Sequence, residues 1–344
     1  MAEPVDLPEP DRVEGAPHPR ETLRLIGHND AERGFLDVYN SGRLHHGWLI
    51  TGPRGVGKAT FAWRIARFLL ATPPADDNDM FGAPPAPETL DIPEDHPVMR
   101  RSMALSEPNL YLLRRGPNEK GDKLANEILV KEVRKLKGFF SMSSADGGRR
   151  VVIIDAADEM NTNAANAILK LLEEPPANTI MLLICHQPAR LLPTIRSRCR
   201  ELRLSPLSPA DMSTALGGTG ADMSPADADA LAELAGGSVG DALRLIHQDG
   251  LKLYQMLMRI MATMPDLDRP AALNLAQSLA VRGQEGKLGL FFKLVDLAMV
   301  RLARTGLGTP PARFASSDEQ AVLTRLSPHS KAAREWATLA QEAG

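Results

Sequence analysis

A glycine-rich loop between a short apolar run and a helical segment constrains this chain more than any other feature. The loop reads GPRGVGKAT over residues 52–60, follows the apolar run 47–51 and opens the segment 58–71, whose apolar side chains recur at helical spacing. Backbone N–H groups of such a loop point inward around phosphate oxygens, the helix N-terminus adds partial positive charge, and Lys58 adds a full one. The pattern predicts strand, phosphate-binding loop and helix; the alternative is a glycine turn that only caps the helix.

The expected ligand is ATP or ADP with Mg²⁺, bound weakly or without hydrolysis. In loops of this kind the residue after the lysine is Ser or Thr, whose hydroxyl holds the metal ion, but here it is Ala59. Thr60 lies about 100° further around the helix, so its hydroxyl points elsewhere. The predicted nucleotide-contacting residues of the loop are Gly52, Gly55, Gly57, Lys58, Ala59 and Thr60.

A second motif, VVIIDAADE over residues 151–159, predicts a central parallel strand that ends in an acidic residue. Asp155 at the tip of this strand is placed to hold Mg²⁺ through water, and the alternative is a capping role. An active ATPase of this type has Glu at the next position, where this chain has Ala156. A positioned general base contributes about 10²–10⁴-fold to rate, so hydrolysis is expected to be poor. Asp158 and Glu159 are predicted to form a solvated helix start.

Apolar runs at 109–114, 150–155 and 179–185 alternate with helical segments, which predicts a parallel sheet covered by helices on both faces. No long β-branched run follows Leu204. We therefore predict an α/β domain over 21–205, a small helical domain over 206–249 and an all-helical domain over 250–344. The acidic, proline-rich residues 1–20 are predicted to be a disordered tail, and residues 72–96 a surface insertion.

Composition excludes several classes of protein. The net charge is −3, so no overall field draws the chain to nucleic acid, and any such contact needs a local patch. Cys185 and Cys199 are the only cysteines, too few for a disulfide framework or a four-cysteine zinc site. The N-terminus lacks the pattern of a signal peptide, and no apolar run is long enough to span a membrane. We expect a cytoplasmic protein without zinc.

Three segments carry a resemblance to a known family: RLHHGWLITGPRGVGK at 43–58, ANAILKLLEEPP at 165–176 and LLPTIRSRC at 191–199. Together they resemble the bacterial clamp-loader subunits of the AAA+ class, over about residues 22–245. The resemblance implies an AAA+ P-loop domain, a helical lid domain and a C-terminal collar domain that mediates oligomerisation. It also implies a hetero-pentamer with ATPase motor subunits and a delta subunit, acting on primed DNA and, indirectly, on the sliding clamp.

In this family the Ser-Arg-Cys motif carries an arginine finger, so the resemblance implies that Arg198 acts in the ATP site of a neighbouring subunit. The alternative is a surface salt bridge. The chain departs from the family's ATPases elsewhere. Gly240 stands where many have an arginine, and Cys185 or His186 stands where a polar sensor residue is expected. The four-cysteine zinc module of many relatives is absent or replaced by residues 72–108.

A basic helix face is the last candidate site. Lys131, Arg134 and Lys135 occupy positions i, i+3 and i+4, and therefore lie on one face of a helix predicted over 127–142. The resemblance implies that this face contacts the phosphates of DNA held inside the ring. The alternative is a plain solvated face.

The preferred hypothesis is a clamp-loader subunit within a DNA polymerase holoenzyme that has little or no ATPase activity, acts as a stator and donates Arg198. One alternative is an active AAA+ ATPase, either a clamp-loader motor subunit or a helicase-type ATPase. The missing glutamate after Asp155 argues against it. Another is a small-molecule kinase, which would not explain the Ser-Arg-Cys motif or the helical last third of the chain.

Overall fold

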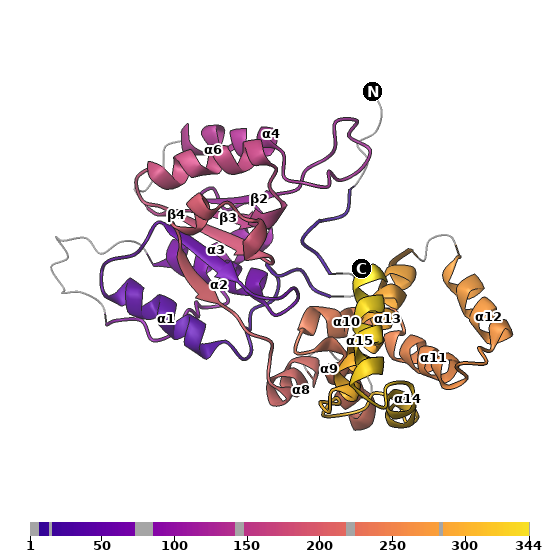
Figure 1. Ribbon diagram of the computed structural model, residues 1–344. Helices are drawn as coiled ribbons and strands as arrows, with labels where there is room; N and C mark the ends of the chain where they lie inside the picture. Colours follow the sequence, from indigo (N-terminus) through magenta and orange to yellow (C-terminus); the bar gives the residue numbers. More distant parts are fainter. Residues whose placement is uncertain are drawn as a thin grey trace. The chain divides into compact units, whose positions relative to one another are not determined.

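The computed structural model describes residues 7–13, 16–72, 85–141, 148–217, 224–281 and 285–343. The chain divides into two compact units, residues 1–206 and 207–344 (Figure 1). Parts of the predicted tail (1–6, 14–15) and of the predicted insertion (73–84) lie outside the described residues.

The first unit is built on a five-stranded sheet in which all paired strands are parallel. Its strands are β1 (Gly47–Thr51), β2 (Leu110–Arg114), β3 (Arg150–Asp155), β4 (Thr179–Cys185) and β5 (Arg200–Arg203). Their order across the sheet is β2-β3-β4-β1-β5. The predicted parallel α/β fold class is therefore confirmed. Because the strands are parallel, β1, β3 and β4 all end at one edge, the carboxyl edge, where the phosphate-binding loop begins.

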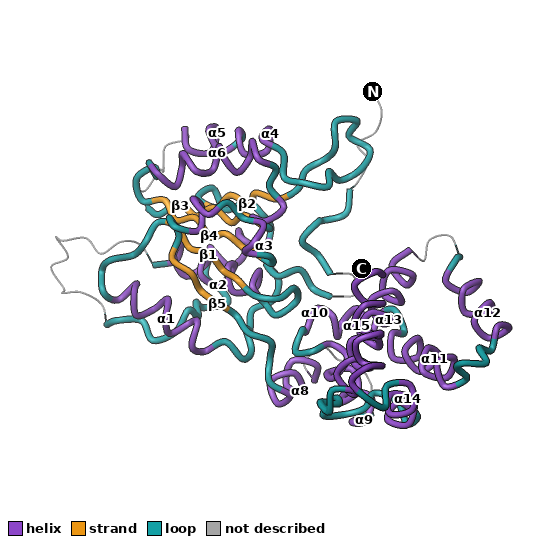
Figure 2. Tube along the Cα trace, in the orientation of Figure 1, coloured by secondary structure: helices purple, strands orange, loops and turns teal. Residues whose placement is uncertain are grey.

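Helices cover both faces of this sheet (Figures 1 and 2). On one face lie α4 (Val130–Arg134), α5 (Leu136–Ser141) and α6 (Thr162–Glu173), whose apolar side chains join alternate residues of β3 and β4 in one core cluster. On the other face α2 (Lys58–Ala71) packs against β1, β3 and β4, with α1 (Asn29–Asn40) and α3 (Pro97–Met103) beside it. The helix predicted over 127–142 is, in its described residues up to 141, two short helices that meet at Lys135, and residue 142 lies outside the described residues.

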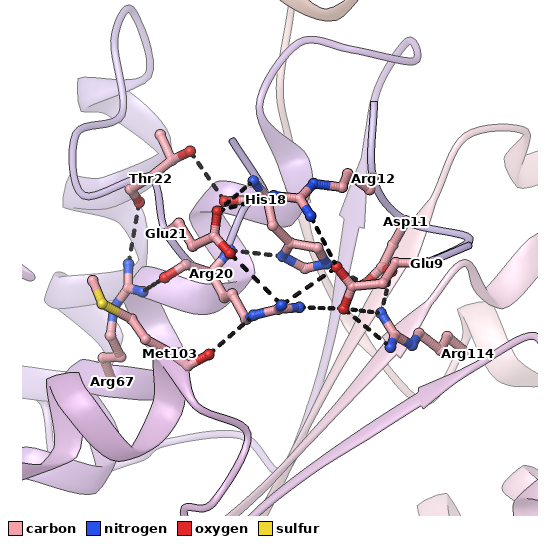
Figure 3. Close-up of polar contacts among 10 residues, drawn as sticks. All are labelled: Glu9, Asp11, Arg12, His18, Arg20, Glu21, Thr22, Arg67, Met103 and Arg114. Atoms are coloured by element: carbon pink, nitrogen blue, oxygen red, sulfur yellow. Dashed lines mark hydrogen bonds and ion pairs between the residues drawn. The ribbon is translucent and has the colours of Figure 1, made fainter. Parts of the chain in front are cut away.

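Residues 9–22 are here named the N-terminal strap, and they overlap the disordered tail predicted over 1–20. In the structure its described residues, 9–13 and 16–22, contact the sheet and two helices (Figure 3). Glu9 pairs with Arg20 at 2.6 Å and with Arg114 at 3.3 Å. Asp11 pairs with Arg114 and, at 3.1 Å, with the buried His18. Composition alone suggested disorder because acidic residues and prolines dominate the strap. The cation that Glu9 and Asp11 share, Arg114, is distant in sequence.

The strap also anchors α2 and α3. The guanidinium of Arg20 donates to the carbonyl of Met103 at 3.0 Å, at the end of α3. The guanidinium of Arg67, on α2, donates to the carbonyls of Arg20 at 2.8 Å and Thr22 at 3.3 Å. One connected network of ion pairs and hydrogen bonds therefore joins the strap to α2, α3 and the end of β2 (Figure 3).

In the described residues of the second unit, all regular secondary structure is helical. Its helices are α8 (Pro209–Gly217), α9 (Pro225–Ala235), α10 (Val239–His247), α11 (Gly250–Ala262), α12 (Arg269–Leu279), α13 (Glu285–Gly306), α14 (Glu319–Leu326) and α15 (Ser330–Ala343). The segments predicted as a lid and as a collar lie together in this unit, and Arg301 on α13 pairs with Glu233 on α9. None of the helices in the described part of the chain combines the length and apolarity needed to cross a bilayer.

Candidate functional site

The loop between β1 and α2 has a backbone that only glycine tolerates at two positions. Gly52 has a φ of 143°, and a Cβ there would lie 2.2 Å from the carbonyl oxygen of Leu204. Gly57 has a φ of 104°, and a Cβ would lie 2.9 Å from the side chain of Leu25. His28 Nε2 lies 2.7 Å from the carbonyl oxygen of Val56 and fixes the middle of the loop. The predicted strand–loop–helix arrangement is present.

The ammonium group of Lys58 is held inside this loop. It donates to the carbonyl oxygen of Gly52 at 2.7 Å and to that of Pro53, and Lys58 is only 3% exposed. Burial lowers the pKa of Lys58 to about 8, although Asp155 and Asp158 oppose the shift. Two of the three N–H donors of this ammonium are therefore already bonded to the loop's own carbonyls. Ala59 and Thr60 lie in the first turn of α2, and both are half-buried.

Asp155 lies at the end of β3, at the same edge of the sheet as the loop. Burial raises the pKa of Asp155 to about 7, and Asp11 and Glu159 add like charge, while Lys58 acts in the opposite sense. Within the described residues, no group of three His, Cys, Asp or Glu side chains is arranged to hold a metal ion. Mg²⁺ often binds through one carboxylate together with substrate phosphates, so Asp155 fits the ion only as the companion of a nucleotide.

Asp158 and Glu159 are not the solvated helix start that the sequence predicted. Asp158 is buried, and its two oxygens accept the backbone N–H groups of His186 and Gln187, each at 3.0 Å. Glu159 pairs with Arg54 of the loop at 2.9 Å and with Arg115 at 2.9 Å. The prediction was wrong because a short 3₁₀ turn, Ala157–Glu159, carries both carboxylates under the ends of neighbouring strands. Asp158 is thus the site residue that the sequence reasoning missed.

Replacing Asp158 with asparagine is expected to lower the free energy of unfolding by about 1–3 kcal/mol, because the amide NH₂ would face a backbone N–H donor. Urea denaturation followed by circular dichroism measures the change. Asp95→Asn, at an exposed position, is the matched control and should be neutral. Equal midpoints for both variants would contradict the bonding described for Asp158.

The predicted sensor position carries groups that are neutral at physiological pH. Burial raises the pKa of the Cys185 thiol to about 12. Burial also lowers the pKa of His186 to about 4, with Lys58 and Arg54 adding to the shift. The Nδ1 atom of His186 is buried and, among the described residues, has no hydrogen-bond partner. Gly240 belongs to the second unit.

Arg198 lies far from the loop of its own chain. It stands just before β5, whose first residue, Arg200, pairs with Trp48 at the start of β1. The phosphate-binding loop follows the other end of β1, and five strand residues separate the two edges by roughly 13 Å or more. The Arg198 guanidinium donates to the Thr194 carbonyl at 3.0 Å and pairs with Glu173 at 2.9 Å, while its side chain stays 37% exposed. It is half-exposed at the amino edge of the sheet.

The basic face predicted on one helix is exposed but partly engaged. Lys131 donates to the carbonyl oxygens of Pro117 and Asn118, at 2.9 and 3.4 Å. Lys135 pairs with Glu132 at 2.5 Å. Arg134 is exposed on α4. Because two of the three cations already have intrachain partners, contact with DNA phosphate remains a prediction.

Comparisons with known proteins identify a family for the first unit. Residues 27–208 match the family described as "DNA polymerase III, delta subunit". The chain is 38% identical over 208 residues to a DNA polymerase III subunit delta' of Pseudomonas aeruginosa, covering 60% of this chain and 57% of that protein. It is 31% identical over 224 residues to the Escherichia coli subunit delta', covering 65% and 61%. The chain therefore matches less than two thirds of the length of these relatives.

Among solved structures, a Thermotoga maritima RuvB Holliday junction branch migration motor aligns with a TM-score of 0.43 and 14% identity. The alignment covers 93% of this chain and 92% of that one.

Proposed function

The chain belongs to the DNA polymerase III delta subunit family, and from this premise we propose that it is a clamp-loader subunit of the delta-prime kind. In this role it hydrolyses little or no ATP, acts as a stator and places Arg198 in the ATP site of a neighbouring subunit. Its partners are the ATPase motor subunits and delta in a hetero-pentamer. The complex loads the sliding clamp onto primed DNA, and Lys131, Arg134 and Lys135 contact DNA phosphates.

The position of Arg198 is the observation that carries this proposal. Its guanidinium is half-exposed at the amino edge of the sheet, while the loop of the same chain lies at the carboxyl edge. A guanidinium that stabilises the charge on a transferring phosphoryl group must touch that group. Arg198 can therefore act only on a nucleotide held by another subunit.

The residues of the loop and their contacts explain why this chain is expected to hydrolyse ATP poorly. Ala59 supplies no hydroxyl to magnesium, Ala156 supplies no general base, and Lys58 is engaged by the loop's own carbonyls. The carboxylates nearby are also committed, since the buried Asp158 binds backbone N–H groups and the half-buried Glu159 binds two arginines. ATP or ADP with Mg²⁺, if bound, is therefore retained without turnover, with Lys58 and Asp155 as its charged contacts.

Purified chain is expected to release no phosphate from ATP above the rate of a Lys58→Met variant. The control removes the loop's ammonium, so any shared signal comes from contaminating ATPases. Steady-state phosphate release at saturating Mg-ATP, with and without primed DNA, makes the measurement. Turnover that depends on Lys58 would favour the alternative, an active AAA+ ATPase, and would remove the stator proposal.

A further inference from the structure

The turn that carries Arg198 is tightly fixed at its backbone. A Cβ on Gly47 would lie 2.9 Å from the Leu172 side chain, 3.2 Å from the Arg198 carbonyl oxygen and 3.3 Å from Cys199 Sγ. The start of β1, the end of α6 and the turn therefore meet without room for one extra carbon. His46 Nε2, 2.9 Å from the Leu172 carbonyl oxygen, ties the same two elements together.

The guanidinium is fixed as well. It is held by the Thr194 carbonyl in α7 (Pro193–Arg196) and by the Glu173 carboxylate at the end of α6. The two contacts involve different terminal nitrogens, Nη1 and Nη2. An arginine has five N–H donors, so donors remain for a phosphate while both contacts persist. A long side chain that is already ordered loses less freedom when it meets its target.

We propose that Glu173 is a positioning residue for Arg198: its carboxylate, at the end of α6, holds the guanidinium of Arg198 in the orientation that a neighbouring nucleotide requires, and Arg198 itself lies on the turn packed against Gly47. The inference rests on the proposed function, because it assumes that Arg198 acts on another subunit's ATP. Glu173 touches no reacting atom in this account, and its whole effect passes through Arg198.

The size of the effect follows from the exposure of the pair. Both side chains reach solvent, so the ion pair is weak, and its loss should lower the rate by about two- to fivefold. Glu173→Gln is the sharpest substitution because it keeps the size of the side chain and one acceptor oxygen while removing the charge. Glu173→Ala removes both and should lower the rate further.

The test uses the loader complex assembled from this chain and its cognate subunits, with primed DNA. Glu173→Gln is expected to lower kcat for ATP about two- to fivefold, with the KM for ATP and the assembly of the complex unchanged, since no ground-state contact with nucleotide is lost. Glu174→Gln, at the exposed adjacent position, is the matched control and should match the unmodified complex.

A double variant separates positioning from a general structural role. If Glu173 acts only through Arg198, Glu173→Gln should cause no further loss in an Arg198→Ala background. A further loss there, an unchanged kcat for Glu173→Gln alone, or an increase in kcat would each overturn the inference. If Arg198→Ala itself leaves the rate unchanged, the proposed finger fails and the inference fails with it. If only Arg198→Ala lowers the rate, the finger stands and the inference alone fails.

Discussion

A complex that carries Arg198→Ala is expected to assemble normally and to lose about 10³-fold or more of its ATP turnover at the site that Arg198 serves. The loss is expected because the variant removes the positively charged guanidinium that stabilises the negative charge on the transferring phosphoryl group. The side chain is 37% exposed and contacts its own chain through Glu173 and the Thr194 carbonyl, so its removal should cost this subunit little stability.

Phosphate release by the assembled complex with primed DNA measures the first half of this prediction, and sedimentation of the complex measures the second. Arg196→Ala is the matched control, because Arg196 is an exposed arginine two residues earlier. Arg196→Ala should leave both the ATP turnover and the assembly of the complex unchanged. Equal turnover for Arg198→Ala and Arg196→Ala would show that Arg198 is only a surface salt bridge.

The second large effect is expected at Arg301, in the middle of the helical unit. Its side chain is 5% exposed and pairs with Glu233 at 3.0 Å and with Glu319 at 3.1 Å. Glu319 is 0% exposed and also accepts a hydrogen bond from the Tyr254 hydroxyl at 2.7 Å. Arg301→Met would leave the Glu319 charge buried without a cation, which typically costs about 3–5 kcal/mol.

Urea denaturation of the full chain, followed by circular dichroism, measures this loss. Arg304→Met lies on the same helix at an exposed position and is expected to be neutral. Adding Glu319→Gln to Arg301→Met should recover part of the loss, because the uncompensated charge is then removed. If Arg301→Met unfolds at the same urea concentration as Arg304→Met, the ion pairs of Arg301 with Glu233 and Glu319 do not stabilise the helical unit.

The parts of the fold that could be predicted are those in which local pattern and tertiary environment agree. The runs at 47–51, 150–155 and 179–185 are apolar because each strand is covered on both faces, so their composition alone identifies them. The glycine loop could be predicted for a similar reason. Its backbone requires glycine at Gly52 and Gly57, whatever surrounds it.

The parts that escaped prediction depend on partners distant in the sequence. Strand β5 reads Arg-Glu-Leu-Arg, and only Leu202 is buried, so no pattern marks it as a strand beside β1. Nothing in the local sequence distinguishes Asp158 from other acidic residues that follow a strand. Its partners, the backbone N–H groups of His186 and Gln187, come from the segment after β4. The predicted lid and collar differ in sequence position, but the pairing of Glu233 with Arg301 joins them across 68 residues.

The strap has a consequence for how the protein is made. Glu9 and Asp11 find their shared partner, Arg114, 105 and 103 residues later in the chain. During synthesis these carboxylates are made long before Arg114, and contacts of such long sequence separation form late. The strap is therefore expected to be among the last parts of the first unit to dock onto the end of β2.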